Sequence, residues 1–486
     1  MTETPNVSLA VLLDGLPVQG ERPNLVISGL ALDNRAIEPG WAFIALAGQT
    51  THGLAFAESA VANGAVAVLH DGQATPPAGL DVPVLAVEGL AGHLPLLAQR
   101  QWGSINGLDL VAVTGTNGKS SVAWLMAQAL DGAMIGTLGV GRPGQQQVLE
   151  HTTPDRLSLH RLLAGLRDAG ETRVVLEASS HALDQGRLAG LTWTSTIFTA
   201  LGHDHLDYHP DLAAYGEAKA RLFTDFDSRR SLVNVDDAFG RQLVERLAGR
   251  RELFPYAIDD PSVACRIHPI GLAATATQAE ILLDGEPILF SSRLVGRVNL
   301  YNLLIVGIEL RARGLDSLAI AERLSALTPV PGRMEALGSE RGVTAVIDYA
   351  HTPDALEKAL AGLAELHNGE LVCVFGCGGD RDRAKRPMMG RIAESLADQV
   401  ILTNDNPRSE NPLAIIREIQ SGMHRPDRAR VISDRKAAIE RALLDARPGD
   451  VVLVAGKGHE DYQHIGDQRL PFSDRATALN YLEGNA

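Results

Sequence analysis

The stretch from Asp109 to Met126, DLVAVTGTNGKSSVAWLM, constrains the fold of this chain more than any other segment. It begins with a short apolar run rich in valine, which is typical of a buried strand. A glycine-rich turn follows, and then Val122, Leu125, Met126 and Ala129 recur at i, i+3, i+4 and i+7, the spacing of a helix. Strand, glycine turn and helix in this order predict a parallel α/β domain that binds phosphate at the turn.

The turn itself, GTNGKS from Gly115 to Ser120, has the ending of a phosphate-binding loop. Val113 stands where the GxxxxGK[ST] pattern begins with glycine, so only the second half of that pattern is matched. Backbone N–H groups at such a turn bind phosphate oxygens. Lys119 would offset the charge of the β- and γ-phosphates, and the Ser120 hydroxyl suits a magnesium ion. The turn therefore predicts a bound nucleotide, but not the acceptor of its phosphoryl group.

The length of 486 residues suggests about three domains. The first hundred residues hold short apolar runs between glycine and proline, typical of a small α/β module. The segment LTPVPGRMEAL, Leu327 to Leu337, predicts a hinge. Four apolar runs beyond it each end in a polar loop, which predicts a second site-building α/β domain. We expect domains over residues 1–100, 101–332 and 333–486.

The composition argues against several classes of protein. A formal charge of −15 disfavours a protein that wraps nucleic acid or lies on a membrane surface. Aromatic residues make up 4%, too few for a base-stacking surface. No apolar run approaches the roughly 18 residues that cross a bilayer, and the amino terminus lacks the basic start of a signal peptide. Three cysteines cannot form a disulfide framework or a four-cysteine zinc site. We expect a cytoplasmic protein without nucleic-acid or membrane partners.

Two further strand ends offer ligands for Mg²⁺ near the nucleotide. Glu177 lies in LEASSH, and His205 lies in GHDHLDYH. The histidines and aspartates between positions 203 and 209 also fit a zinc site, but zinc spacing such as HExxH is absent, so we favour magnesium. Downstream, Tyr215, Lys219 and Leu222 share one helical face. For Lys219 a solvated helix lysine and a functional lysine both stay open.

The stretch DNPRSENP predicts a binding loop for a carboxylate. Proline restricts the residue before it to extended conformations, so Asn406-Pro407 would hold Arg408 in a rigid loop that points its guanidinium outward. A guanidinium binds a carboxylate through two parallel hydrogen bonds. Glu460 in GKGHEDYQ could receive an ammonium, and the two groups together suit a zwitterionic amino acid. An internal surface ion pair is the alternative.

The order of the motifs resembles that of the Mur ligases. The motifs are VTGTNGKSS, LEASSHAL, HDHLDYH, GEAKARLF, GRVNLYN, PGRMEAL, DYAHTPDAL, GGDRDRAKRP, DNPRSE and AGKGHEDYQ. The resemblance runs from about Leu32 to Gln463 and is strongest to members that add meso-diaminopimelate during peptidoglycan assembly. It implies three α/β domains: a small amino-terminal uridine-nucleotide-binding module, a central P-loop-type ATPase domain with a parallel sheet, and a Rossmann-like carboxyl-terminal domain.

The resemblance also implies the reaction and its cofactor. In this family ATP phosphorylates a substrate carboxylate, an incoming amine attacks the acyl phosphate, and an amide forms with release of phosphate and ADP. Phosphate is a better leaving group than a carboxylate oxygen, so catalysis is mostly positioning and charge neutralisation. Mg²⁺ is the implied cofactor, with Ser120, Glu177, His205 and a carbamylated Lys219 as ligands. Lys119, Glu177, His205 and Lys219 are the implied catalytic residues.

Other implied contacts follow residue by residue. ATP would contact Gly115, Thr116, Asn117, Gly118, Lys119, Ser120, Ser121, Asn302, Arg333, Asp348 and His351. The UDP-muramoyl dipeptide would contact Leu32, Asn34, Gln49, Thr50, Thr51, Thr152, Thr153, Ser179, Gln185 and Arg187. The incoming amino acid would contact Arg381, Asp405, Asn406, Pro407, Arg408, Gly456 and Glu460.

Two positions depart from the family pattern, and one selects among its members. The family often has serine where Asn34 stands and histidine where Gln49 stands; both replacements still form hydrogen bonds. The lysine-adding members lack the arginine of DNPR, so Arg408 favours diaminopimelate, whose far carboxylate lysine lacks. A buried arginine left unpaired should cost lysine about 3 kcal/mol or more.

Three rival functions remain to be weighed. A lysine-adding ligase is disfavoured by Arg408, and a folylpolyglutamate synthase by the amino-terminal uridine module. A nucleotide-dependent binding protein without catalysis is disfavoured by the intact Lys119, Glu177, His205 and Lys219. We expect a monomer that acts on small molecules only.

Overall fold

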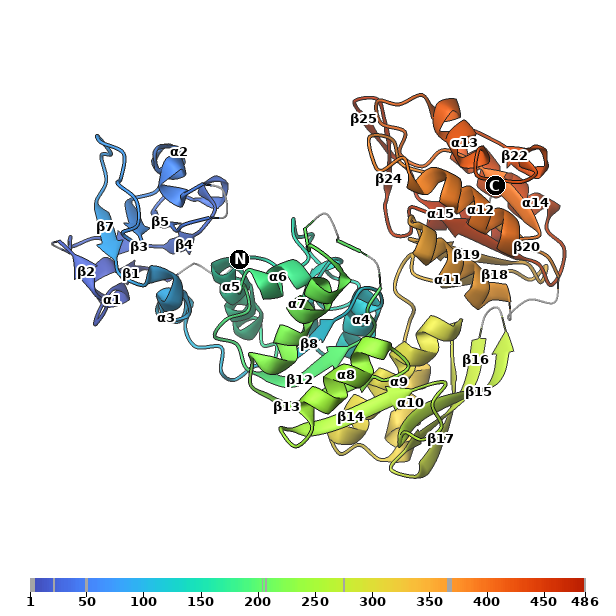
Figure 1. The fold of residues 1–486 in the computed structure, drawn as a ribbon, viewed down its shortest axis with the longest axis horizontal. Coiled ribbons are helices and arrows are strands. Elements are labelled where there is room, and N and C mark those ends of the chain that lie inside the picture. Colours follow the sequence, from blue (N-terminus) through green and yellow to red (C-terminus); the bar gives the residue numbers. More distant parts are fainter. Residues whose placement is uncertain are drawn as a thin grey trace. The chain divides into compact units, whose positions relative to one another are not determined.

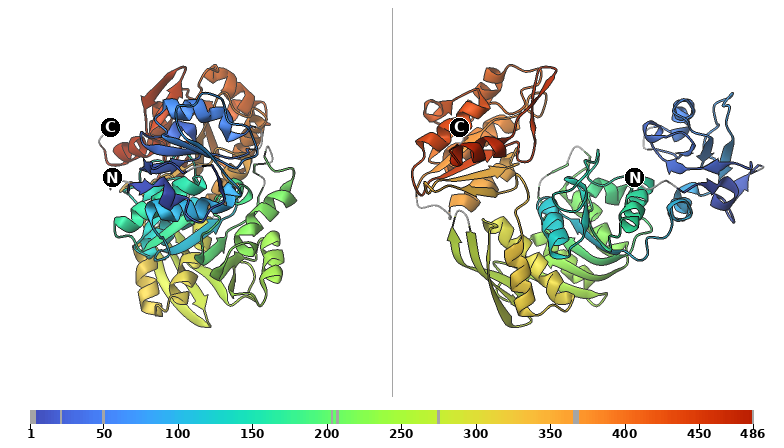
Figure 2. Two further views of the ribbon diagram at one scale, coloured as in Figure 1. Left: turned by 90° about the vertical axis from the view of Figure 1, so that its left-hand side faces the viewer. Right: turned by 180° about the vertical axis from the view of Figure 1, so that it is seen from behind.

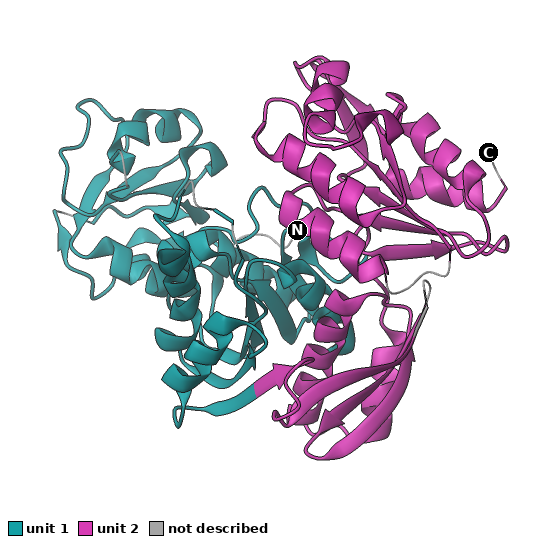
Figure 3. Cartoon of the chain, turned by 45° about the vertical axis from the view of Figure 1, so that its right-hand side comes forward, with its two compact units in different colours: residues 1–254 teal, residues 255–486 magenta. Residues whose placement is uncertain are grey.

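The computed structural model describes residues 5–20, 22–48, 51–202, 204–205, 208–273, 276–364 and 369–484. It divides into two compact units, Met1–Phe254 and Pro255–Ala486 (Figure 3). Within the described residues, no helix has the length and apolar character needed to span a membrane. The three cysteines are free and buried.

The first unit begins with a five-stranded sheet of order β2-β7-β6-β5-β4 (Figure 1). Strands β4 to β7 are parallel, and β2 is antiparallel to β7. Strand β5 is buried along its whole length because its two faces pack into two different hydrophobic cores. Ala42 and Ile44 belong to one core, and Trp41 and Phe43 belong to the other. The elements are β1 (Val7–Ser8), α1 (Leu9–Leu12), β2 (Val18–Gln19), β3 (Val26–Ile27), β4 (Gly29–Ala31), the 3-10 helices η1 (Asn34–Ala36) and η2 (Gly53–Phe56), β5 (Trp41–Ala45), α2 (Ala57–Ala62), β6 (Ala67–His70), β7 (Val84–Val87) and α3 (Leu90–Trp102).

The same unit continues into a parallel sheet with β8 at its centre, in the order β10-β9-β11-β8-β12-β13. Only β10 is antiparallel to its neighbour. The strand and helix predicted around the glycine turn are confirmed as β8 and α4, but α4 is buried on more than the predicted stripe: Trp124 and Ala127 are buried as well. The elements are β8 (Asp109–Thr114), α4 (Lys119–Ala129), β9 (Ala133–Gly136), β10 (Gly139–Gly141), α5 (Arg156–Asp168), β11 (Arg173–Glu177), α6 (Ser180–Asp184), β12 (Trp193–Phe198), α7 (Leu212–Thr224), β13 (Ser228–Asn234) and α8 (Ala238–Leu247).

The second unit begins with β15, β16 and β17, which form antiparallel hairpins. These strands were not predicted from the sequence. Strand β16 nevertheless alternates buried and more exposed residues, as a strand with one face on the core does. Helices α9 and α10 follow them. The elements are β14 (Glu252–Ala257), where the first unit passes into the second, β15 (Cys265–Ala273), β16 (Ala276–Leu283), β17 (Glu286–Ser292), α9 (Arg297–Ala312) and α10 (Ser317–Ala326).

A six-stranded sheet of order β18-β19-β23-β20-β21-β22 completes the second unit. The four strands predicted beyond Leu337 are confirmed as β19, β20, β21 and β23; they are parallel neighbours, so their carboxyl ends share one edge. Helices α11 to α13 cover one face, and α14 and α15 cover the other (Figures 1 and 2). The elements are β18 (Glu335–Gly338), β19 (Thr344–Asp348), α11 (Pro353–Ala364), β20 (Leu371–Phe375), α12 (Lys385–Leu396), β21 (Gln399–Leu402), α13 (Pro412–Gln420), η3 (Pro426–Arg428), β22 (Arg430–Val431), α14 (Arg435–Asp445), β23 (Val451–Ala455), β24 (Tyr462–Ile465), β25 (Gln468–Pro471) and α15 (Asp474–Leu482).

Candidate active site

The glycine loop after β8 is fixed by the loop that follows the neighbouring strand β12. The Thr116 N–H donates to the Ala200 carbonyl at 2.7 Å, and the Thr199 hydroxyl donates to the Asn117 carbonyl at 2.6 Å. Gly115 has φ +148°, and a Cβ there would overlap the Thr199 hydroxyl, so glycine is required. The loop conformation is therefore set by its neighbours before any ligand binds.

Two lysines meet at this loop. Lys119 Nζ donates to the carbonyl oxygens of Gly115 and Thr116, each at 2.9 Å. Lys219 Nζ, from α7, donates to the same Gly115 oxygen at 2.9 Å and lies 4.1 Å from the centre of the Tyr215 ring. Burial, and then the charge of Lys119, lowers the pKa of Lys219 well below its ordinary value. Lys219 is 1% exposed, so the solvated-lysine alternative is wrong.

Glu177, at the end of β11, is fully buried beside the loop. Its Oε2 accepts from the Ser120 hydroxyl at 3.0 Å and from the Thr137 hydroxyl at 3.3 Å, while Oε1 accepts from the Thr137 N–H at 2.9 Å. A Cβ on Gly136 would overlap this carboxylate, so Gly136 leaves the room that Glu177 occupies. Carboxylate and hydroxyl oxygens suit Mg²⁺. The structure thus brings together two of the four predicted metal ligands, Ser120 and Glu177.

His205 lies in an aromatic cluster in the loop after β12. Its ring centre is 4.9 Å from that of His181 and 6.1 Å from that of Tyr215, the ring that Lys219 contacts. The backbone of His205 has φ +54°. Within the described ranges, which omit position 203 and positions 206–207, no group of three or more His, Cys, Asp or Glu side chains is placed to hold a metal.

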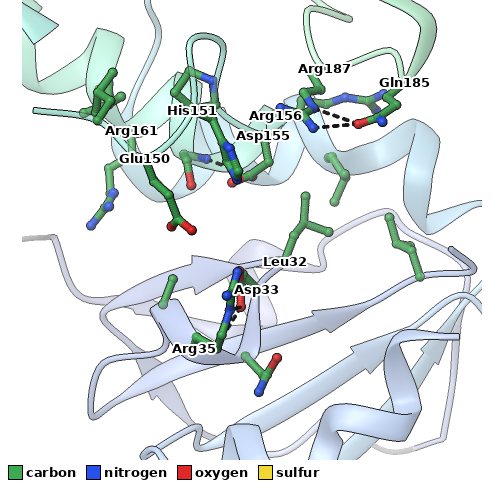
Figure 4. Close-up of a pocket in the computed structure, with 18 of the residues that line it drawn as sticks. Leu32, Asp33, Arg35, Glu150, His151, Asp155, Arg156, Arg161, Gln185 and Arg187 are labelled. Carbon is green, nitrogen blue, oxygen red and sulfur yellow. Dashed lines mark hydrogen bonds and ion pairs between the residues drawn. The ribbon is translucent and has the colours of Figure 1, made fainter. Parts of the chain in front are cut away.

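A cavity of about 990 Å³ lies in the first unit, between the turn after β4 and the segment around α5 (Figure 4). Of the residues predicted for the UDP-muramoyl dipeptide, Leu32, Asn34, Gln185 and Arg187 line it. Polar side chains with no predicted role line it too: Asp33, Arg35, Glu150, His151, Asp155, Arg156 and Arg161. The Arg161 guanidinium lies 5.0 Å from the centre of the Trp41 ring.

The other predicted precursor contacts form a hydrogen-bonded run between the cavity and Glu177. Arg187 Nη1 donates to the Thr153 carbonyl at 2.6 Å, and the Thr153 hydroxyl donates to the Glu177 carbonyl at 2.6 Å. The hydroxyls of Thr152 and Thr137 are 3.0 Å apart. Ser179 caps α6 and donates its N–H to the Thr153 hydroxyl at 3.1 Å.

Three further predicted residues follow Gly48 in the sequence. Gln49 and Thr50 lie outside the described residues. Thr51 is exposed, and its carbonyl accepts from the Gly48 N–H at 3.2 Å. The predicted contact of these three residues with uridine stays a prediction.

The nucleotide contacts predicted in the second unit gather mostly at the end of β19. Asp348 accepts from the Met334 N–H at 2.7 Å and the Ala350 N–H at 2.8 Å, and burial raises its pKa. The Arg333 guanidinium lies 4.6 Å from the centre of the Tyr349 ring. His351 Nδ1 is 2.7 Å from the Tyr349 carbonyl, and burial lowers the pKa of this histidine.

Asn302 differs from these residues in its surroundings. It lies in α9, is 2% exposed, and donates through Nδ2 to Asn299 at 2.9 Å. Its predicted contact with ATP stays a prediction.

Arg408 lies in the loop after β21 with φ +50°, a left-handed conformation that non-glycine residues rarely adopt. The β24–β25 hairpin holds it there: the Arg408 N–H donates to the His464 carbonyl at 3.0 Å, and its carbonyl accepts from the Gly466 N–H at 2.9 Å. Its guanidinium does not simply point outward as predicted, because Nη1 donates to the Gly379 carbonyl at 2.5 Å.

The loop after β20 lies against this arginine. Both predicted arginines border Gly378. A Cβ added to this glycine would lie 3.3 Å from Arg408 Nη1 and 3.7 Å from Arg381 Cγ. The Gly379 N–H donates to the Asn406 carbonyl at 2.9 Å, which fixes the two loops together. The structure thus brings Arg381, Asn406 and Arg408 to one place.

The remaining predicted residues surround a lysine that the sequence analysis missed. Lys457 is fully buried, and its Nζ donates to Asn406 Oδ1 at 3.1 Å and to Glu460 Oε2 at 2.8 Å. Asn406 Nδ2 donates to the same Glu460 oxygen at 3.0 Å. Asp405 is buried beside Gly456, and burial raises the Asp405 pKa. The one feature of the sequence that could have indicated a role for Lys457 is its position between Gly456 and Glu460, two residues predicted to contact the amino acid.

Three family models match the chain in sequence order. They are "Mur ligase family, catalytic domain" at residues 26–102, "Mur ligase middle domain" at residues 113–308, and "Mur ligase, glutamate ligase domain" at residues 332–458. The chain belongs to the Mur ligase family. It is therefore an enzyme of a family of ATP-dependent ligases that form amide bonds, on a fold of three α/β domains.

Individual relatives agree with this assignment. The UDP-N-acetylmuramoyl-L-alanyl-D-glutamate–2,6-diaminopimelate ligase of Xylella fastidiosa is 45% identical over 98% of this chain and 97% of its own length. The enzyme of the same name from Xanthomonas campestris is 45% identical over 94% of both chains. A solved structure of a ligase of that name is 33% identical, covers 99% of both chains and superposes with a TM-score of 0.72.

Proposed function

We propose that this Mur ligase joins meso-diaminopimelate to the D-glutamyl carboxylate of UDP-N-acetylmuramoyl-L-alanyl-D-glutamate, with ATP and through an acyl phosphate. The names of the relatives that span nearly the whole chain support this substrate pair. Such a reaction supplies a peptide precursor of peptidoglycan. We infer further that the chain works as a monomer in the cytoplasm, with domains over residues 1–100, 101–332 and 333–486.

The single observation that carries the phosphoryl step is the run of polar contacts from the nucleotide loop to the cavity. The Ser120 hydroxyl contacts the Glu177 carboxylate, and the Thr153 hydroxyl donates to the Glu177 carbonyl at 2.6 Å. Arg187, which lines the cavity, donates to the Thr153 carbonyl at 2.6 Å. A γ-phosphate on the loop and a carboxylate reaching in from the cavity would meet along this run. Holding both reactants in place supplies much of the rate enhancement in phosphoryl transfer.

Different groups of the glycine loop would bind different parts of the ATP triphosphate. Backbone N–H groups from Gly115 to Ser121 would bind the phosphate oxygens at the start of α4. Lys119 now contacts two carbonyl oxygens of its own loop and would turn to the β- and γ-phosphates when ATP binds. Arg333, Asp348, His351 and Asn302 would contact the rest of the nucleotide.

Mg²⁺ fits the oxygen donors beside the loop. Ser120 and Glu177 would hold it, with His205 and a carbamylated Lys219 as further ligands. When bound, the ion would neutralise charge on the phosphates and on the carboxylate that accepts the phosphoryl group. Lys219 favours carbamylation because only a neutral amine attacks carbon dioxide, and its lowered pKa makes that form more abundant.

The cavity of the first unit would hold the UDP-muramoyl dipeptide. Leu32, Asn34, Gln185 and Arg187 line it, and the arginines Arg35 and Arg161 add positive charge that a diphosphate requires. Gln49, Thr50 and Thr51 would contact the uridine nucleotide. Thr152, Thr153 and Ser179 would hold the dipeptide end near Glu177.

The incoming amino acid would bind at the shared edge of β20, β21 and β23. Arg408 and Arg381 border the same glycine and would bind the far carboxylate of diaminopimelate, while Glu460 would receive an ammonium. Asp405, Asn406, Pro407 and Gly456 would shape this pocket. Lysine, which lacks the far carboxylate, would leave Arg408 without its partner, which disfavours the lysine-adding alternative.

Phosphate release tests the proposal. The purified enzyme with ATP and Mg²⁺ should release phosphate only when both the muramoyl dipeptide and meso-diaminopimelate are present. Phosphate release in the absence of either substrate, or no release with both present, would contradict the proposed function. Faster release with lysine than with diaminopimelate would support the lysine-adding alternative instead.

A further inference from the structure

Lys457 is a buried lysine that lies among the residues proposed to bind the incoming amino acid. It follows β23 and Gly456, and its side chain is 0% exposed. An uncompensated charge in such a place is strongly unfavourable, so a buried lysine requires partners that repay its desolvation. The structure supplies three: Asn406 Oδ1 at 3.1 Å, Glu460 Oε2 at 2.8 Å, and the Tyr462 ring, whose centre is 5.2 Å from Nζ.

These contacts come from separate segments around the pocket. Asn406 belongs to the loop after β21, Glu460 to the loop after β23, and Tyr462 begins the β24–β25 hairpin. Asn406 Oδ1 also accepts from the His464 N–H at 2.9 Å, in the hairpin that holds the backbone of Arg408. Lys457 therefore joins the loop of Arg408 to the loop of Glu460.

The contacts also fix which oxygen of Glu460 is engaged. Oε2 accepts from both Lys457 and Asn406, so the protein's own donors converge on one of its two oxygens. Glu460 is 19% exposed, so its carboxylate reaches the surface of the pocket. The orientation set by Lys457 leaves Oε1 for a ligand's ammonium.

The charge of Lys457 has a second effect. Asp405 and Glu460 are two carboxylates in one pocket, and the charge of Glu460 acts to raise the Asp405 pKa while that of Lys457 acts to lower it. Burial is the largest influence and raises the Asp405 pKa, and Arg435 opposes it more than Lys457 does. Lys457 is therefore one of two cations that favour the ionised form of Asp405.

We propose that Lys457 is a positioning residue for the incoming amino acid: it holds Glu460 by one oxygen, so that the other binds the ammonium of that substrate. The inference rests on the proposed function of the site. Lys457 acts through Glu460 and does not itself touch the substrate, because its side chain is fully buried and its Nζ lies among Asn406, Glu460 and the Tyr462 ring.

The test is a cycle of Lys457→Met, Glu460→Gln and the double variant, with KM measured for each substrate. Lys457→Met should raise the KM for meso-diaminopimelate about tenfold or more, with little change in the KM of ATP or of the muramoyl dipeptide. The double variant should be close to Glu460→Gln alone, because glutamine has no second carboxylate oxygen to bind the ammonium, so its orientation by Lys457 no longer matters. Lys436→Met is the matched control: that lysine is 65% exposed, pairs with Glu440 at 3.5 Å, and should leave every KM unchanged.

The outcomes separate the inference from the proposed function. If the unmodified enzyme does not need both substrates for phosphate release, the proposed function fails first. If it does, and Lys457→Met leaves the diaminopimelate KM unchanged or its effect simply adds to that of Glu460→Gln, Lys457 has no positioning role. The double variant removes both charges together and keeps the test open if Lys457→Met alone does not fold.

Discussion

Lys119 and Lys219 donate to the same acceptor, the carbonyl oxygen of Gly115, each at 2.9 Å. Two ammonium groups on one oxygen would repel each other, and burial together with the charge of Lys119 lowers the pKa of Lys219, which favours its neutral amine. Triphosphate would draw Lys119 away from this oxygen, and carbamylation would convert Lys219 into an anion. We therefore expect Lys119 to act as the cation that binds phosphate and Lys219 to react as an amine.

Replacing Lys219 by alanine should reduce activity by about 100-fold or more, because the proposed carbamate ligand of Mg²⁺ could not form. Short carboxylates such as formate or acetate should restore part of the activity by taking the place of the carbamate. Steady-state phosphate release with and without the carboxylate measures this. A fully active variant would show that Lys219 has no catalytic part.

The same lysine predicts a pH dependence of stability. Its pKa is lower in the folded chain than its ordinary value of 10.5, so between the two values the unfolded chain binds more protons and folding stability rises with pH. In buffer free of carbon dioxide and ligands, the unmodified protein should therefore gain stability relative to Lys219→Met as the pH rises toward 10.5. Urea unfolding at several pH values measures the difference, and a difference that falls as the pH rises would contradict the lowered pKa of Lys219 in the folded chain.

Replacing Gly136 by alanine should abolish most activity, because the added methyl overlaps the Glu177 carboxylate and displaces it from Ser120 and Thr137. Gly165→Ala is the matched control: it lies in α5 with nothing within 4 Å of the new Cβ, and should stabilise the fold by about 0.5–1 kcal/mol without changing activity. Equal activity of the two variants would show that Glu177 does not need its present position.

Arg408→Ala should raise the KM for meso-diaminopimelate steeply, by about 100-fold, and leave the KM for ATP nearly unchanged. Arg408→Gly should have the same kinetic effect but be more stable than the alanine variant by about 1 kcal/mol, because φ +50° is strained for any residue with a Cβ. Kinetics with diaminopimelate and lysine, with thermal unfolding, test both. Unchanged selectivity over lysine would remove Arg408 from the pocket.

The parts of the fold and of the site that could be predicted from the sequence are those that a local sequence pattern determines. The strand, turn and helix around Lys119 follow from periodicity and glycine, and parallel strand order then brings Ser120 and Glu177 together. Thr137 was missed because it follows β9, which joins this edge through tertiary pairing that no local pattern reveals. Lys457 was missed for a similar reason: burial decides its role, and a lysine in a glycine-rich loop reads as exposed.

The strained backbone of Arg408 was also beyond the sequence. The proline after Asn406 suggested a rigid loop, but the left-handed conformation depends on hydrogen bonds to a hairpin more than fifty residues away in the chain. The hinge predicted at Leu327 to Leu337 connects α10 to β18, and its motion stays a prediction.

Oxygen-18 in the glutamyl side-chain carboxylate of the muramoyl dipeptide tests the central claim most directly. If ATP phosphorylates that carboxylate, attack by the amine leaves one of its oxygens on phosphorus, so the released phosphate should carry one labelled atom per turnover. Mass spectrometry of the phosphate measures this. Unlabelled phosphate from a turnover that forms the amide would contradict the acyl-phosphate account.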